Sequence, residues 1–146
     1  MPFVAPRILY VAHDSGGGFE QVFSTIQTML EDRAFAVDLH RVGQDTSPAN
    51  LDAYAGVVIG TSVQGMGFGG ELSPDLKKCV EGLGDLEEVR VALFSVYRLR
   101  PGGVLEELES LVDGLGAEVV ARQALGGKNM DKGMHFIPTE CMVRIR

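Results

Sequence analysis

Three stretches rich in glycine or hydroxyl side chains contain the residue types best suited to hold a small ligand. The first follows a short apolar run and consists of Asp14, Ser15, Gly16, Gly17, Gly18 and Phe19. Glycine lets successive backbone N–H groups converge, and the positive end of a following helix adds to their attraction for an anion such as phosphate. Two interpretations remain open: an anion site to which Ser15 adds a hydroxyl, or simply a tight turn. The carboxylate of Asp14 opposes phosphate if it points inward.

The second stretch is long and places apolar side chains among glycines. It consists of Thr61, Ser62, Val63, Gln64, Gly65, Met66, Gly67 and Phe68, and it continues to Gly70. Long loops in compact domains are often functional, and a flexible backbone with apolar side chains suits a flat aromatic ligand. The alternative is that Met66 and Phe68 fold back as a small satellite core.

The third stretch consists of Ser95, Val96, Tyr97 and Arg98. The ring of Tyr97 can stack on a planar ligand. Arg98 or Arg100 can meet an anionic ring or the carboxylates of a partner, although loop arginines are more often simply solvated.

Other reactive side chains do not form a recognisable site. His13, His40 and His135 are not at metal-ligand spacing with Cys79 or Cys141, so no metal site is predicted. No Gly-x-Ser-x-Gly elbow and no Cys-His pair is present, and we identify no catalytic residue. The two distant cysteines indicate free thiols in a reducing compartment.

The elements that must position these stretches alternate between two periodicities. Short apolar runs predict five strands, at residues 8–12, 35–39, 56–60, 91–96 and 118–121. Apolar residues at three- and four-residue steps, together with Ser-Pro helix starts and a C-cap at Gly84, predict helices over residues 19–30, 48–54, 74–83 and 104–115.

This alternation predicts a single α/β domain spanning residues 1–146, with a doubly wound parallel sheet. Ligands bind such sheets at the carboxyl ends of the strands, so the three stretches are expected to meet. After Leu125 only 21 residues remain, including Gly126, Gly133 and Pro138. A full closing helix is therefore not expected, and the C-terminal segment is predicted to be short or atypical. Sheet surface left bare in this way would suit a second subunit, which makes a homodimer possible.

Composition excludes several classes of protein. The chain has 146 residues, is 45% hydrophobic, and carries 13 Lys and Arg against 20 Asp and Glu, for a formal net charge of -7. An acidic surface argues against nucleic acid and anionic membranes as partners. There is no apolar run long enough to span a bilayer and no signal peptide, so a cytoplasmic location is expected.

The sequence resembles the flavodoxin family over nearly its whole length. The resemblance lies in three segments: Ile8–Val11 with the glycine-rich turn and Glu20–Val22, then residues 51–63, then Gly65 and Gly67 to Leu72. It implies a five-stranded sheet in the order 2-1-3-4-5 that binds FMN and transfers electrons to a redox partner. It also implies that Ser15 to Phe19 hold the FMN phosphate, and that the isoalloxazine lies between the loops of Met66 and Tyr97.

The phosphate loop departs from the family's pattern. The family's Thr-Gly-Asn-Thr core is replaced by Gly16, Gly17, Gly18 and Phe19, so backbone donors remain while side-chain donors are lost. Each lost charge-assisted hydrogen bond costs about 1.5–3 kcal/mol, roughly tenfold or more in affinity. Phe19 also stands where it could block the phosphate. The sequence therefore leaves weak FMN binding and an interaction module that has lost FMN as alternatives.

A second alternative comes from short local similarities. Residues 40–42, 58–63 and 92–96 resemble the menaquinone-dependent protoporphyrinogen oxidase branch of the same family. This implies an FMN-dependent oxidase or quinone reductase, with a quinone-type acceptor in place of a redox protein.

Overall fold

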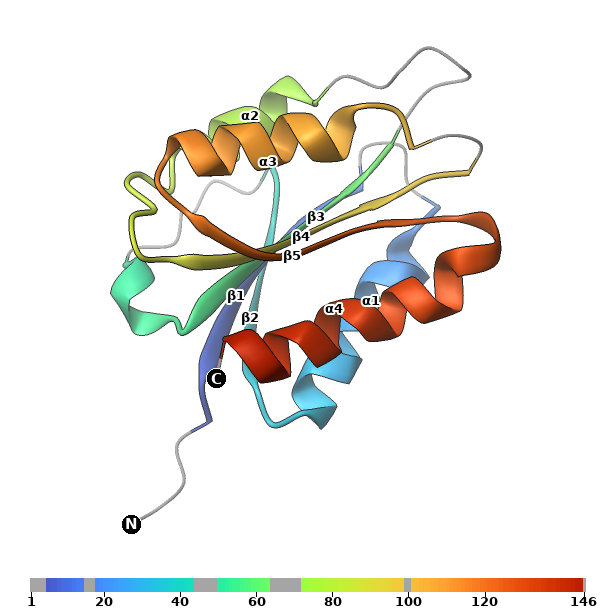
Figure 1. The fold of residues 1–146 in the computed structure, drawn as a ribbon, viewed down its shortest axis with the longest axis horizontal. Coiled ribbons are helices and arrows are strands. Elements are labelled where there is room, and N and C mark those ends of the chain that lie inside the picture. The colour runs from blue at the N-terminus through green and yellow to red at the C-terminus, as the bar shows by residue number, and fades with distance from the viewer. Residues whose placement is uncertain (1–4, 15–17, 44–49, 64–71, 99–100, 146) are drawn as a thin grey trace.

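The computed structural model describes residues 5–14, 18–43, 50–63, 72–98 and 101–145 (Figure 1). The five strands are β1 (Arg7–His13), β2 (Ala36–Arg41), β3 (Gly56–Ser62), β4 (Arg90–Val96) and β5 (Glu118–Leu125). All four pairings are parallel and the order is β2-β1-β3-β4-β5. Both the predicted α/β class and the predicted strand order are confirmed. β2 and β5 extend beyond their predicted ends, at residues 39 and 121.

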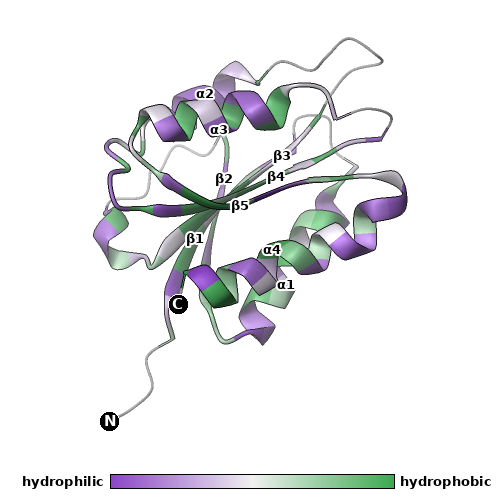
Figure 2. Ribbon diagram, viewed as in Figure 1, coloured by the Kyte–Doolittle hydropathy of each residue, from purple (hydrophilic) through white to green (hydrophobic). Residues whose placement is uncertain are grey.

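Four helices cover the sheet in two layers. They are α1 (Glu20–Asp32), α2 (Pro74–Glu81), α3 (Val104–Gly114) and α4 (Met130–Arg144). Figure 1 shows α1 and α4 on one face and α2 and α3 on the other. Each face encloses its own cluster of buried side chains, because the central strands are apolar on both sides. Figure 2 shows this as hydrophobic colour concentrated along the central strands.

The helix before β3 is shorter than predicted. The described residues hold only a 3-10 turn, η1 (Leu51–Ala53), whose start is capped by Asn50: its side chain accepts the Asp52 N–H at 2.9 Å. The expected start at Ser47 and Pro48 lies outside the described residues. At the other predicted start, Ser73 and Pro74 open α2 as expected.

The C-cap of α2 is Gly82, two residues before the predicted Gly84. Gly84 instead takes a left-handed φ of 85° in the turn that follows, where a residue without Cβ is favoured. The helix signal was therefore in the right place, but its end was assigned to the wrong glycine.

The C-terminal segment is a full helix, and the prediction of a short or atypical end is wrong. A 3-10 turn, η2 (Gly127–Asn129), leads into the 15 residues of α4, which lies beside α1 and packs on β5 (Figure 1). Pro138 sits inside the helix and is buried with Gly133, Ile137 and Cys141. A Cβ at residue 133 would collide with the Leu125 side chain, so glycine permits the close approach of helix and strand.

Because α4 covers this face of the sheet, the expectation of a second subunit can no longer rest on a missing closing helix. Burial among apolar side chains raises the pKa of the Cys141 thiol to about 12.

In the described part of the chain, no helix is both long and apolar enough to cross a membrane.

Candidate functional site

A row of polar side chains crosses the carboxyl ends of the three central strands. His13 on β1 is in register with Thr61 on β3, and Thr61 is in register with Ser95 on β4. Their exposed fractions are 8%, 2% and 0%. All three lie on the sheet face covered by α2 and α3, because the residues two positions earlier on each strand belong to the cluster beneath those helices. Successive strands are added on one side of β1 up to β2 and on the other side from β3 onward. The row therefore lies at the switch point of the strand order, where ligands bind in doubly wound sheets.

Hydrogen bonds order one end of this row and leave the other open. Thr61 Oγ1 lies 3.2 Å from His13 Nδ1 and donates to the Ser62 carbonyl at 3.2 Å. A hydroxyl has one proton, so His13 Nδ1 is the donor in its pair with Thr61. Ser95 Oγ is buried and has no hydrogen-bond partner within the described ranges. An unsatisfied buried hydroxyl costs about 1–3 kcal/mol, which a ligand or water at this edge would relieve.

Burial of His13 makes a prediction about pH. Desolvation lowers the pKa of His13 below its ordinary value of 6.5, against the opposing charges of Asp75 and Asp14. The folded state therefore binds this proton less readily than the unfolded chain does. We expect the stability contributed by neutral His13 to be complete above pH 6.5 and to be lost as the pH falls from 6.5 through the lower pKa of the folded state.

Urea unfolding of the wild type and of His13→Asn, across that pH range, measures this loss. Asn keeps a nitrogen donor towards Thr61 but does not titrate. The wild type is expected to lose more stability than the variant. Equal losses would contradict the assignment, because the remaining histidines are common to both proteins.

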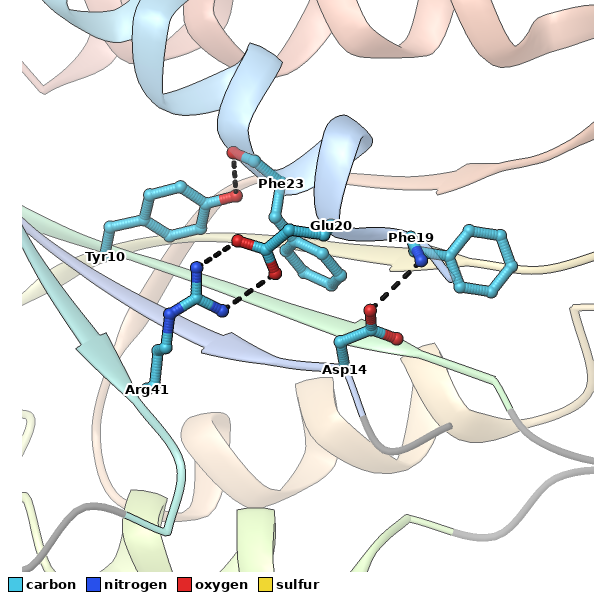
Figure 3. A network of polar contacts seen from close by, with 6 residues as sticks. All are labelled: Tyr10, Asp14, Phe19, Glu20, Phe23 and Arg41. Carbon is cyan, nitrogen blue, oxygen red and sulfur yellow. Dashed lines mark hydrogen bonds and ion pairs between the residues drawn. The ribbon is translucent and has the colours of Figure 1, made fainter. Parts of the chain in front are cut away.

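An internal carboxylate engages the backbone of the residue just before α1. Asp14 Oδ2 accepts the Phe19 backbone N–H at 3.0 Å (Figure 3). Asp14 Oδ1 is buried without a partner among the described residues. The inward-pointing carboxylate that would oppose phosphate is thus what the structure shows. One backbone donor of the predicted anion site is already occupied.

An ion pair fixes the same helix end to the sheet. The Nη1 and Nη2 atoms of Arg41, at the end of β2, both donate to the carboxylate of Glu20, with Nη1 at 2.9 Å (Figure 3). On the neighbouring strand β1, the hydroxyl of Tyr10 donates to the Phe23 carbonyl at 2.9 Å. Burial raises the pKa of Tyr10 well above its ordinary value, so the hydroxyl remains a donor.

The first and third predicted stretches meet at Arg98. Its guanidinium carbon lies 4.9 Å from the centroid of the Phe19 ring, in cation–π geometry. One guanidinium nitrogen would lie 2.7 Å from a Cβ at residue 18, so Arg98 lies against the backbone of Gly18. Gly18 has a left-handed φ of 93°. A side chain at residue 18 would therefore be both strained and in the way of Arg98.

Tyr97 is half-buried, and one face of its ring lies against Gly126 at the end of β5. A Cβ at residue 126 would lie 2.6, 2.6 and 2.8 Å from three neighbouring ring atoms. Such similar distances place that position over the face of the ring rather than at its edge. Gly126 therefore packs against one face of the Tyr97 ring. A planar ligand could stack only on the opposite face.

The structure brings part of the predicted set together. Thr61, Ser95, Asp14, Gly18, Phe19, Tyr97 and Arg98 lie along the carboxyl edge as expected. Val96 belongs to the core beneath α1 and α4, and the Val63 N–H donates to its carbonyl at 2.8 Å. Ser62 is buried. The rest of the predicted set lies outside the described residues: Ser15, Gly16, Gly17, Gln64, Gly65, Met66, Gly67 and Phe68.

Sequence reasoning missed two participants. His13 is not in the predicted set: it could assist a phosphate at the neighbouring loop, but the sequence favours an ordinary hydrogen bond of a loop histidine, whereas the structure places it at the end of β1. Gly126 was noted only as an obstacle to a helix. The signal for His13 was its position, since it immediately follows an uninterrupted apolar strand. No sequence signal pairs Gly126 with Tyr97.

Comparisons with known proteins identify the architecture. No protein-family model matches the chain, and no curated protein sequence matches it. Solved structures do match. Two-electron reduced flavodoxin from Megasphaera elsdenii has a TM-score of 0.76 at 16% identity, over 93% of this chain and 98% of that one. Oxidised flavodoxin 1 from Bacillus cereus has a TM-score of 0.73 at 18% identity, over 94% and 97%. A flavodiiron core from Synechocystis has a TM-score of 0.68 at 12% identity, over 94% of this chain and 34% of that one. The fold of this protein is flavodoxin-like.

Proposed function

We propose that this protein binds FMN at the carboxyl ends of β1, β3 and β4 and serves in electron transfer. The observation that carries the proposal is the buried polar row of His13, Thr61 and Ser95 at the switch point of the sheet. Its last hydroxyl has no partner in the part of the chain that is described. The flavodoxin-like fold supports this choice of ligand, since its solved examples include reduced and oxidised flavodoxins.

The described residues fit a flavin mononucleotide in three respects. Tyr97 offers a ring whose rear face is supported by Gly126, which suits stacking on a planar ring system. Ser95 offers a hydrogen-bonding group already removed from water. Arg98 brings a positive charge to Gly18 and Phe19, beside the start of α1. Asp14 is the feature that fits less well, because its carboxylate occupies the Phe19 amide.

The protein's own contribution would be to bind and orient the ring and to keep water from it. FMN supplies the chemistry when bound, because its ring system accepts and releases electrons. Tyr97 would cover one side of the ring, while Ser95 would hydrogen-bond a polar atom of the ligand. His13, donating to Thr61, would hold the neighbouring hydroxyl in place. These contacts would set the affinity and the reduction potential.

Titration of the protein into FMN tests the proposal directly. We expect the fluorescence of free FMN to be quenched, with a dissociation constant in the micromolar range rather than the nanomolar one, since the phosphate loop lacks the Asn and Thr donors of the family's core. Tyr97→Ala is expected to weaken binding about fivefold, because an aromatic pair contributes about 0.5–1.5 kcal/mol beyond buried area.

Tyr54→Phe is the control, because the Tyr54 hydroxyl donates to Asp38 on the edge strand β2 and lies outside the proposed site. It is expected to bind FMN as the wild type does. A protein that folds normally but leaves FMN fluorescence unchanged at millimolar concentration would sink the assignment.

One observation favours a second candidate, an interaction module that keeps the fold without the cofactor. Asp14 satisfies the Phe19 N–H from within the chain, as expected of a helix end that needs no ligand. The same titration separates the two functions, because the module would bind neither FMN nor riboflavin.

A further inference from the structure

Arg98 is exposed, yet its guanidinium is held in a defined place by apolar and backbone contacts. It lies over the Phe19 ring at 4.9 Å and against the backbone of Gly18. None of the ion pairs found among the described residues involves Arg98. The charge is therefore positioned at the mouth of the predicted phosphate loop without being neutralised there.

The other charged groups at this end of the sheet are already engaged or have the wrong sign. Arg41 is paired with Glu20 through both guanidinium nitrogens. Asp14 takes the Phe19 N–H with one oxygen and leaves the other buried without a partner within the described segments. The backbone before α1 therefore presents a carboxylate to an incoming anion, and this charge opposes the binding of a phosphate.

We infer that Arg98 binds the phosphate group of the flavin, replacing the side-chain hydroxyls that the glycine-only loop lacks. This inference rests on the proposed function. A planar guanidinium presents two parallel N–H donors, which match two oxygens of a phosphate group. The contact with Phe19 holds the side chain near the loop before the ligand arrives, which reduces the entropy lost on binding. Gly18 provides the space that Arg98 needs for this approach.

The experiment compares FMN with riboflavin, which differs only by the phosphate. In the wild type we expect FMN to bind at least tenfold more tightly than riboflavin. Arg98→Gln is expected to weaken FMN binding about tenfold or more and to change riboflavin binding less than twofold. Arg98→Lys keeps the positive charge without the two parallel N–H donors of the guanidinium. We expect it to bind FMN more weakly than the wild type but more tightly than Arg98→Gln.

Arg90→Gln is the matched control. Arg90 begins β4 and Arg98 follows its end, so the two substitutions remove the same charge at opposite edges of one sheet. The Arg90 side chain is exposed, and its polar partners among the described residues are the Arg144 carbonyl and Glu118. We expect FMN binding to Arg90→Gln to match the wild type, which excludes a general effect of net charge.

Asp14→Asn provides a change of opposite sign. The amide retains an oxygen for the Phe19 N–H and removes the negative charge that faces the phosphate. We expect FMN to bind several-fold more tightly and riboflavin to bind as before. This arm distinguishes an electrostatic role of the pocket from a loss of structure, because a damaged site would not gain affinity.

Two outcomes overturn the inference in different ways. If FMN and riboflavin bind equally and Arg98→Gln changes neither, Arg98 does not hold the phosphate while the proposed flavin function stands. If neither flavin binds, the proposed function fails, and inorganic phosphate then decides the inference. Amide shifts of Gly18 and Phe19 on adding phosphate, lost in Arg98→Gln, would uphold an anion site at Arg98. No such shifts would overturn it.

Discussion

Phe94→Ala is expected to lower the free energy of unfolding by about 3–5 kcal/mol, the range typical of a large buried aromatic side chain. Phe94 is fully buried at the centre of β4. Its ring lies 5.5 Å from that of Phe23 on α1 and 6.2 Å from that of Tyr10 on β1. Removing it leaves a cavity between strands and helix that the rigid sheet cannot collapse to fill.

Urea unfolding followed by far-UV circular dichroism measures the effect, since the chain has no tryptophan. Phe136→Ala is the matched control, because that ring lies on the outer side of α4 and is 38% exposed. We expect the control to change stability by less than 1 kcal/mol. A loss below about 2 kcal/mol in Phe94→Ala would show that the core repacks around the missing ring.

Gly60→Ala is expected to lower the free energy of unfolding by about 1–3 kcal/mol or more through overpacking. A Cβ at residue 60 would overlap three atoms of the Phe94 ring. The ring is enclosed on its other sides by Phe23 and Tyr10, so it has no room to move away. Glycine in this strand is thus required by close packing.

A double substitution tests this cause. Leucine at residue 94 has no ring above Gly60, so Gly60→Ala should cost less in a Phe94→Leu background than in the wild type. Gly114→Ala is the control, because a Cβ there meets nothing within 4 Å and α3 accepts alanine readily. Equal costs in both backgrounds would show that the ring is not the obstacle.

Most of the architecture was accessible from hydrophobic pattern. The runs at residues 8–12 and 56–60 are apolar without interruption, and the run at 91–96 is interrupted only by Ser95. These three runs form the central strands, where both faces of the sheet are covered. The mixed segment that follows residue 35 became the edge strand β2, as its polar positions indicate. The periodicity of apolar residues thus predicted which segments form strands and which form helices, and the family resemblance predicted the strand order. Together they predicted which strand ends meet at the carboxyl edge of the sheet.

The closing helix was not predicted because Gly133 and Pro138 are typical of a helix end, although Met130, Met134, Ile137 and Cys141 recur at helical spacing and face the core. The buried side of α4 consists of Gly133, Ile137, Pro138 and Cys141. Glycine and proline there usually indicate a helix end, and only packing against Leu125 shows why glycine is needed. Proline inside the helix forfeits one backbone hydrogen bond, and burial of its ring offsets part of that cost.

The contacts at the candidate site were less predictable than the elements that carry them. The glycine-rich loops predicted where a ligand would bind, and Asp14 was already recognised as an obstacle to phosphate. However, the contact of Arg98 with Phe19 joins residues from separate loops, and it depends on side-chain conformations that only the folded chain defines. The support of Tyr97 by Gly126 is of the same kind.

The burial of Cys141 makes its thiol a probe of how often α4 separates from the sheet. Cys141 is 0% exposed and burial raises the pKa of its thiol to about 12, so alkylating reagents are expected to react mainly with molecules in which α4 has separated from the sheet. Cys79 on α2 is only half-buried and belongs to the opposite layer. Cys79 can therefore react without any opening of the fold, and it serves in the same sample as an internal reference for the slower reaction of Cys141, which reports the opening of α4.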